Sequence, residues 1–189
     1  MNKLITLLLA LVLCPLTLSA QGKRYHGDGI DNVLEYVPLV ATFTLKGCGV
    51  ESASSWKRLA VDGAFSIGLT AGTTYLLKHT INDMRPDRTD NHGFPSGHTA
   101  VVFCGARMLD KEFRHVSPWI SVAGYTVATV TAVDRVRRNR HHWDDVVVGA
   151  AIGIAATEAG YWLGDKLTGE RCRWHLGTDG QTLSLRIDL

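Results

Sequence analysis

Three short segments between residues 78 and 145 carry side chains that could together hold and transfer a phosphate group. One lysine and two arginines supply positive charge: Arg binds phosphate oxygens through a planar fork, and Lys acts as a compact point charge. Two histidines and a carboxylate complete the set, because a carboxylate can orient a neutral imidazole for nucleophilic attack. The segments contain Lys78, Arg85 and Pro86; then Pro95, Ser96, Gly97 and His98; then Arg135, His141 and Asp145.

The spacing in the first two segments predicts how their side chains meet an anion. Lys78 and Arg85 are seven residues apart, about two helical turns, so one helix face would present both. Pro86 favours the end of that helix at Arg85. Ser96 can cap the helix predicted after it, whose free amides would face an anion, and Gly97 permits a close approach of the backbone.

The third segment predicts a histidine held by a carboxylate. His141 and Asp145 are four residues apart, so on a helix they would share one face. The same residue types also suit a zinc or manganese site, and each segment taken alone is a common surface pattern. The three segments together, in this order, favour phosphate transfer through a histidine without a metal.

These segments resemble the signature of the type 2 phosphatidic acid phosphatase superfamily, which includes bacterial class A acid phosphatases and vanadium haloperoxidases. The resemblance covers residues 55–165 and implies an all-α helical bundle that uses no metal or other cofactor. It implies that His141 is the nucleophile that forms a phosphohistidine, that Asp145 orients it, and that His98 is the general acid. The phosphate oxygens would be bound by Lys78, Arg85, Ser96, Gly97 and Arg135.

One position departs from the family pattern. The third segment usually begins Ser-Arg, and here it begins Asp134-Arg135. Asp134 has no hydroxyl to donate and, when ionised, would repel a phosphate. We expect it to turn away or to pair with Arg137 or Arg138.

Apolar stretches separated by short breaks predict a single helical domain over residues 21–169. Residues 84–94 read as a polar loop at the rim of the site. In the tail, residues 170–189, apolar and polar residues alternate around a turn, which predicts a short β-hairpin. The predicted helices cover 31–45 with a break at Pro38, 54–78, 99–114, 118–133 and 141–166.

The first twenty residues read as a secretory signal peptide, with a basic start, an apolar run and small residues at the end. An uncleaved anchor is the alternative. In an oxidising compartment Cys48 and Cys172 could pair, although free thiols are the default expectation. The formal net charge of +2 gives no basic field that would indicate nucleic acid.

Four apolar stretches approach the length of a membrane span: 59–77, 99–109, 117–133 and 146–164. The mean hydropathy of +0.04 is low for a protein with several spans. The stretches are rich in small residues, which suits close helix packing in lipid, and the arginines of residues 135–140 suit anionic headgroups. We therefore expect the membrane to be a partner of this chain.

Residues 85–100, with Trp56-Lys57-Arg58 before them, are similar to envelope lipid phosphatases of Gram-negative bacteria. The resemblance implies a phosphoric monoester hydrolase in the inner membrane with a periplasm-facing site, acting on an anionic lipid phosphate. Lipid A 4′-phosphatase is the favoured prediction. Undecaprenyl diphosphate or phosphatidylglycerophosphate phosphatase and a soluble periplasmic acid phosphatase of broad specificity are the alternatives. A haloperoxidase, usually much larger, and an inactive phospholipid-binding protein are further alternatives, and the sequence leaves the oligomeric state open.

Overall fold

The computed structural model describes residues 30–86, 88, 90–169, 173–178 and 183–188. The predicted signal peptide and Cys172 lie outside the described residues. The described elements are α2 (Asp31–Leu34), α3 (Val37–Gly47), α4 (Trp56–Thr80), α5 (Gly97–Phe113), α6 (Pro118–Arg137), α7 (Trp143–Thr168), β1 (Arg173–Thr178) and β2 (Leu183–Asp188).

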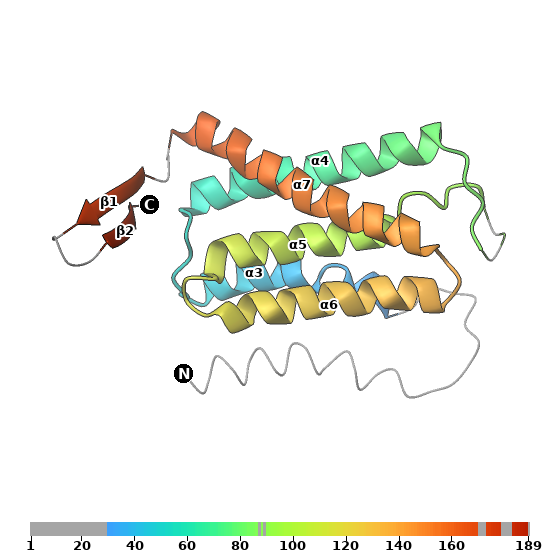
Figure 1. Cartoon of the computed structure of the whole chain (residues 1–189), viewed down its shortest axis with the longest axis horizontal. Helices are drawn as coiled ribbons and strands as arrows, with labels where there is room; N and C mark the ends of the chain where they lie inside the picture. Colours follow the sequence, from blue (N-terminus) through green and yellow to red (C-terminus); the bar gives the residue numbers. More distant parts are fainter. Residues whose placement is uncertain (1–29, 87, 89, 170–172, 179–182, 189) are drawn as a thin grey trace.

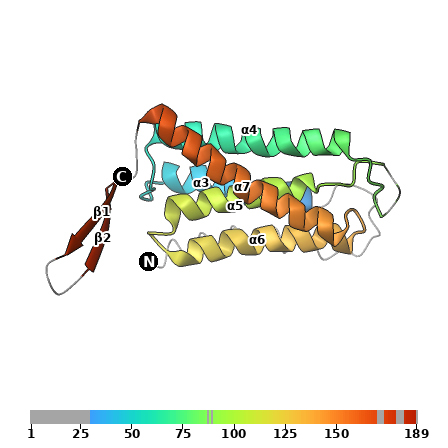
Figure 2. The same ribbon diagram turned by 45° about the horizontal axis from the view of Figure 1, so that its top comes forward.

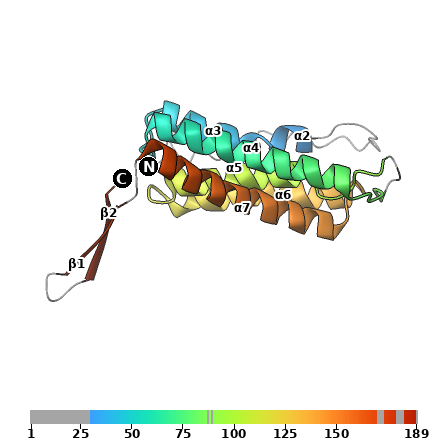
Figure 3. The ribbon, with the colours of Figure 1, turned by 90° about the horizontal axis from the view of Figure 1, so that it is seen from above.

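The long helices form a bundle around α5 (Figures 1 and 2). Helix α5 packs against α3 and α6 on one side and against α4 and α7 on the other. Figure 3 shows from above that α4 and α7 lie side by side. Helix α5 is central because its apolar residues recur around much of its circumference, and Val102, Ala106, Met108 and Phe113 are all fully buried. The structure confirms the predicted all-α bundle.

Two helix boundaries differ from the prediction in ways that affect the site. Helix α4 ends at Thr80, where Ile81 takes up an extended conformation, so Arg85 lies in the following loop and not on the helix. Helix α6 continues beyond residue 133 to Arg137, and α7 begins only at Trp143. The prediction that placed His141 on the last long helix is therefore wrong.

Helix α7 approaches its neighbours closely because it presents glycines to them. A Cβ atom added at Gly153 would lie 2.2 Å from the carbonyl oxygen of Ala100 on α5. One added at Gly160 would lie 2.6 Å from the backbone nitrogen of Ser66 on α4. These separations are too short for any side chain. Gly153 therefore allows α7 to lie close to α5, and Gly160 allows it to lie close to α4.

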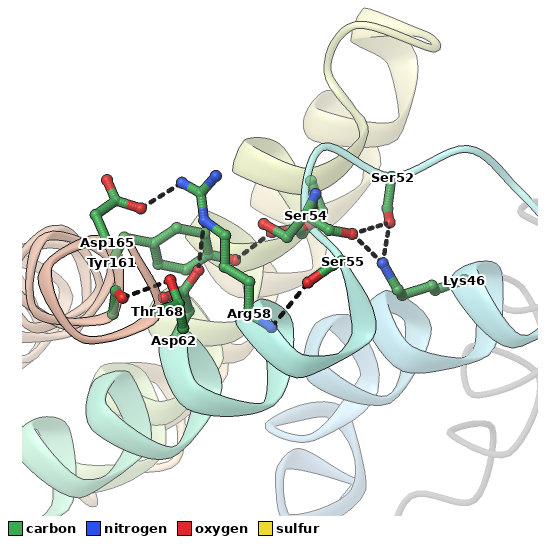
Figure 4. A network of polar contacts seen from close by, with 11 residues as sticks. Lys46, Ser52, Ser54, Ser55, Arg58, Asp62, Tyr161, Asp165 and Thr168 are labelled. Carbon is green, nitrogen blue, oxygen red and sulfur yellow. Dashed lines mark hydrogen bonds and ion pairs between the residues drawn. The ribbon is translucent and has the colours of Figure 1, made fainter. Parts of the chain in front are cut away.

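A network of polar groups joins the N-terminal end of α4 to the C-terminal ends of α5 and α7 (Figure 4). Arg58 on α4 lies 2.5 Å from Asp165 on α7 and 3.5 Å from Asp62. Glu112 on α5 accepts hydrogen bonds from the Ser54 hydroxyl at 2.7 Å and from the Tyr161 hydroxyl at 2.9 Å. These contacts hold the far ends of the three helices in register.

The tail forms the predicted hairpin. Strands β1 and β2 pair antiparallel, with Arg173 opposite Asp188 and Thr178 opposite Leu183. The assignment of residues 1–20, 21–169 and 170–189 to separate parts of the protein stays a prediction.

We predict that Gly153→Ala destabilises the protein by about 1–3 kcal/mol, because the new methyl group would push two helix backbones apart. Gly72→Ala is the matched control: nothing lies within 4 Å of the added Cβ, so this exposed helical position should gain up to about 1 kcal/mol. Thermal unfolding of the two purified variants measures the difference. Equal stability of both variants would contradict the close packing of α7.

Candidate active site

The predicted site residues meet at one end of the bundle. Figure 1 shows the C-terminal ends of α4 and α6 beside the N-terminal ends of α5 and α7, with the described loop residues 81–86 and 90–96 next to them. The segments predicted from sequence lie at these ends: Lys78 in the last turns of α4, Arg85 in the loop, Ser96, Gly97 and His98 at the start of α5, Arg135 near the end of α6, His141 just before α7, and Asp145 in the first turn of α7.

His141 lies between a carboxylate and a guanidinium. Its Nδ1 is 3.5 Å from Oδ2 of Asp145, and its Nε2 is 3.4 Å from Nη2 of Arg135. Asp145 is the third residue of α7, and its Oδ2 also accepts a 2.7 Å hydrogen bond from the backbone N–H of His142, the N-cap residue. His141 and Asp145 are neighbours, as the sequence predicts, but at 3.5 Å Nδ1 of His141 has no hydrogen-bond partner among the described residues. A capping interaction, not a shared helix face, places Asp145 beside the ring.

The surroundings of His141 keep its imidazole neutral. The side chain is almost fully buried, and burial lowers its pKa to about 3, with Arg135, Arg85 and Lys78 acting in the same direction. A backbone hydrogen bond with Gly93 opposes this effect. At neutral pH one ring nitrogen therefore keeps an unprotonated lone pair, and Nε2 faces Nη2 of Arg135.

The cations around His141 have hydrogen-bond donors to spare. Nε of Arg85 donates to Asp90 at 2.8 Å, while its Nη1 is buried and has no hydrogen-bond partner among the described residues. Nε of Arg135 is also buried and has no hydrogen-bond partner among the described residues. Lys78 donates to the carbonyl of His92 at 2.8 Å. Burial and then Arg85 lower the pKa of Lys78 to about 8, so it stays mostly charged at pH 7. Such donors suit an anion.

The turn before α5 is tied to the start of α7. Ser96 occupies the N-cap position as predicted, but its side chain makes no capping hydrogen bond; its Oγ accepts instead from Thr99 at 2.9 Å. The Ser96 N–H donates to the carbonyl of Asp145 at 3.0 Å. Gly97 lies beside Lys78: a Cβ added there would be 3.7 Å from Cε of the lysine, an ordinary van der Waals contact. These contacts join the second and third segments.

His98 contacts α2, which the sequence did not connect with the site. Its Nε2 lies 2.7 Å from Oδ1 of Asn32 and 3.8 Å from Oε2 of Glu35. Burial, with Arg135 next, lowers the pKa of His98 to about 4. Its ring is partly exposed, so it can reach a bound molecule.

Sequence reasoning also missed Asp31. This fully buried carboxylate binds Arg135 through Oδ2 and accepts a 2.6 Å hydrogen bond from Arg138 through Oδ1. No spacing pattern could indicate contacts across more than a hundred residues. Asp134 lies 3.8 Å from Arg138, which confirms the predicted pairing of these two residues. Within the part of the chain that the structure describes, no group of three or more His, Cys, Asp or Glu side chains could hold a metal ion.

Comparison with family models decides the classification. The model described as the PAP2 superfamily matches residues 59–168, more than half of the chain. The chain belongs to the PAP2 superfamily. The match spans the three segments that carry the site.

Three known proteins are similar to this chain. The crystal structure of Aquifex aeolicus LpxE shares the fold, with a TM-score of 0.52 over 80% of this chain and 93% of that one, at 22% sequence identity. A Porphyromonas gingivalis lipid A 1-phosphatase is 43% identical over 75% of this chain. The match spans 33% of that relative's length. Arabidopsis thaliana lipid phosphate phosphatase gamma is 27% identical over 74% of the chain and 70% of its own length.

The spare donors predict that inorganic phosphate binds here and raises the melting temperature progressively as its concentration exceeds the Kd. Lys78→Met should weaken this binding about tenfold or more, because a charged contact to phosphate contributes about 1.5–3 kcal/mol. Lys57→Met, at an exposed position in the first turn of α4, is the control and should bind phosphate like the parent protein. The absence of a phosphate-dependent shift in the parent would contradict the site.

Proposed function

We propose that this protein is a lipid phosphatase that hydrolyses a phosphate monoester through a phosphohistidine, without a metal. The observation that carries the proposal is the buried, neutral imidazole of His141, with Nδ1 towards Asp145 and Nε2 towards the guanidinium of Arg135. That arrangement gives one ring nitrogen a carboxylate partner and leaves the other beside the group that would bind the phosphate.

In the first step, Lys78, Arg85 and Arg135 bind the phosphate oxygens, together with Ser96 and the Gly97 amide. Nε2 of His141 attacks phosphorus, and the bond from phosphorus to the lipid oxygen breaks. The leaving oxygen takes a proton from His98, which acts as general acid. Asp145 stabilises the positive charge that develops on the ring of His141. The products are the free lipid alcohol and phosphohistidine.

In the second step, water attacks the phosphohistidine. His98, now neutral, accepts a proton from the water as the new phosphorus–oxygen bond forms and the phosphorus–nitrogen bond breaks. Inorganic phosphate leaves and His141 returns to its neutral form. His98 is again protonated, so the cycle is closed.

We infer that lipid A is the substrate class and its 1-phosphate the group removed. The Porphyromonas gingivalis relative, at 43% identity, is a lipid A 1-phosphatase by name, and the Arabidopsis relative is named for lipid phosphates. The chain spans a third of the former, and the similarity over that third supports the proposal. The relative favours the 1 position over the 4′ position that the sequence suggested.

A membrane setting in the bacterial envelope, with a periplasm-facing site, fits the surface of the bundle. Among the described helices, α7 is long and apolar enough to cross a bilayer. Large apolar side chains lie exposed near the site end, where a lipid headgroup would enter. They include Tyr75 and Leu76 on α4 and Trp143 and Val147 on α7, each more than 60% exposed.

The substrate assignment is tested by mass spectrometry of envelope lipids from cells with and without the gene. We predict that loss of the gene leaves one additional phosphate on lipid A, located at the 1 position by fragmentation. The parent gene should reverse this, and so should His115→Ala, which changes an exposed residue in the turn after α5, whereas His141→Ala should not. If lipid A is unchanged and undecaprenyl diphosphate or phosphatidylglycerophosphate accumulates, the accumulating lipid is the substrate and the lipid A assignment is wrong. Rescue by His141→Ala would contradict the mechanism.

The pKa values predict different pH profiles for kcat/KM and kcat. In the free protein His98 is protonated only below its pKa of about 4, and His141 is neutral only above its pKa of about 3. A bound phosphate adds negative charge, which raises both values. Activity is lost as pH rises through the pKa of His98, so this loss should occur at higher pH for kcat than for kcat/KM.

Steady-state rates with a soluble phosphate ester, corrected for the ester's own ionisation, measure both profiles. Coincident alkaline limbs, or a flat profile between about pH 4 and 9, would contradict the assigned acid.

A further inference from the structure

We propose that Asn32 is a positioning residue for His98. Its amide oxygen holds the Nε2–H of the imidazole, so that Nδ1 alone gives and takes the catalytic proton. This inference rests on the proposed function, because it assigns a partner to the general acid of that reaction.

The geometry fixes which ring nitrogen is mobile. Oδ1 of Asn32 lies 2.7 Å from Nε2 of His98, a normal hydrogen-bond distance. An amide oxygen only accepts, so Nε2 keeps its hydrogen in both the neutral and the charged ring. Protonated His98 then offers Nδ1–H to the leaving oxygen, and neutral His98 offers the Nδ1 lone pair to water. Both steps of the reaction therefore use the same nitrogen.

An uncharged partner suits this exchange. The charged groups that act on His98 are Arg135, Arg85 and Lys78, which disfavour the imidazolium, and Asp31, which favours it. Glu35 is 3.8 Å away, and burial raises its own pKa. An additional carboxylate in direct contact would hold the proton on His98 more tightly and slow its release. Asn32 orients the ring without adding that charge.

The position of Asn32 is itself determined by the phosphate-binding end of α6. Asp31, the preceding residue, binds both Arg135 and Arg138. Leu34, two residues further along α2, packs in the core against Val102 and Ala106 of α5. Helix α2 therefore links the general acid to the arginine that binds the phosphate.

A partner that orients the acid has an effect that depends on the leaving group. A p-nitrophenolate ion leaves without much help from an acid, whereas an alkoxide must be protonated as it leaves. We predict that Asn32→Leu lowers kcat/KM for hexyl phosphate about 30-fold or more, and for p-nitrophenyl phosphate less than about 3-fold. Val33→Ala, at an exposed position of the same helix, is the control and should change neither value.

Asn32→Asp retains an acceptor and adds a charge. We predict that it moves the alkaline limb of the hexyl phosphate kcat profile up by about one pH unit, because an opposite charge at this distance raises the pKa of the imidazolium. Asn32→Leu should not produce this shift. The two variants therefore separate the orienting effect from the electrostatic one.

The outcomes distinguish this inference from the function on which it rests. A parent protein that hydrolyses both esters, with an Asn32→Leu variant that slows both equally or neither, would overturn the role of Asn32 alone. An unshifted profile in a folded, active Asn32→Asp variant would do the same. Failure of the parent protein to hydrolyse either ester would overturn the phosphatase assignment and the inference with it. Undiminished hydrolysis by His141→Ala would overturn the phosphohistidine mechanism on which the inference rests.

Discussion

The rest of the site depends on an imidazole that is kept neutral first by its burial and then by the cations around it. His141 is almost fully buried near Arg135, Arg85 and Lys78, so a second proton on its ring would be strongly disfavoured. The cations need compensation of their own, and Arg135 receives it from Asp31. Burial raises the pKa of Asp31, whereas its contacts with Arg135 and Arg138 lower it. The net effect is a lowered pKa, so the carboxylate stays ionised. Without Asp31 the buried guanidinium would be unpaired, which is costly.

The fold meets this electrostatic demand through its helix ends. Four helix termini meet at one end of the bundle, and the first turns of α5 and α7 carry His98 and Asp145. Close contact of α7 with α5, permitted by Gly149 and Gly153, brings the two starts together. At the opposite end, Arg58 and Glu112 join the same helices in a polar network. The bundle is thus fixed at both ends, which keeps the site geometry from relaxing.

Much of this arrangement could be predicted from the sequence, because it follows from local patterns. Apolar stretches separated by short breaks predicted the helices, and the three segments predicted the residues that meet at the site. The predictions failed where a helix boundary decided the geometry. Lys78 and Arg85 do not share a helix face, and His141 precedes the helix that carries Asp145. The seven-residue spacing of the first pair suggested one continuous helix, but α4 ends at Thr80. The four-residue spacing of the second pair suggested the same, but α7 begins at Trp143.

The part played by α2 could not be predicted, for a different reason. Asp31 and Asn32 belong to a four-residue helix without a distinctive pattern, and their partners lie 66 to 107 residues further along the chain. Only the packing of the whole bundle brings them to His98 and Arg135. Tertiary structure therefore supplies the contacts of α2 with His98 and Arg135, while the sequence motif supplies the residues to which we assign binding and attack of the phosphate.

The stereochemical course at phosphorus tests the central claim most directly. With a phosphate ester made chiral by three oxygen isotopes, each in-line displacement inverts the configuration. Transfer to His141 and then to an acceptor alcohol comprises two displacements, so the account predicts net retention of configuration. Net inversion would mean that the acceptor attacks the substrate directly, and it would contradict a phosphohistidine at this site.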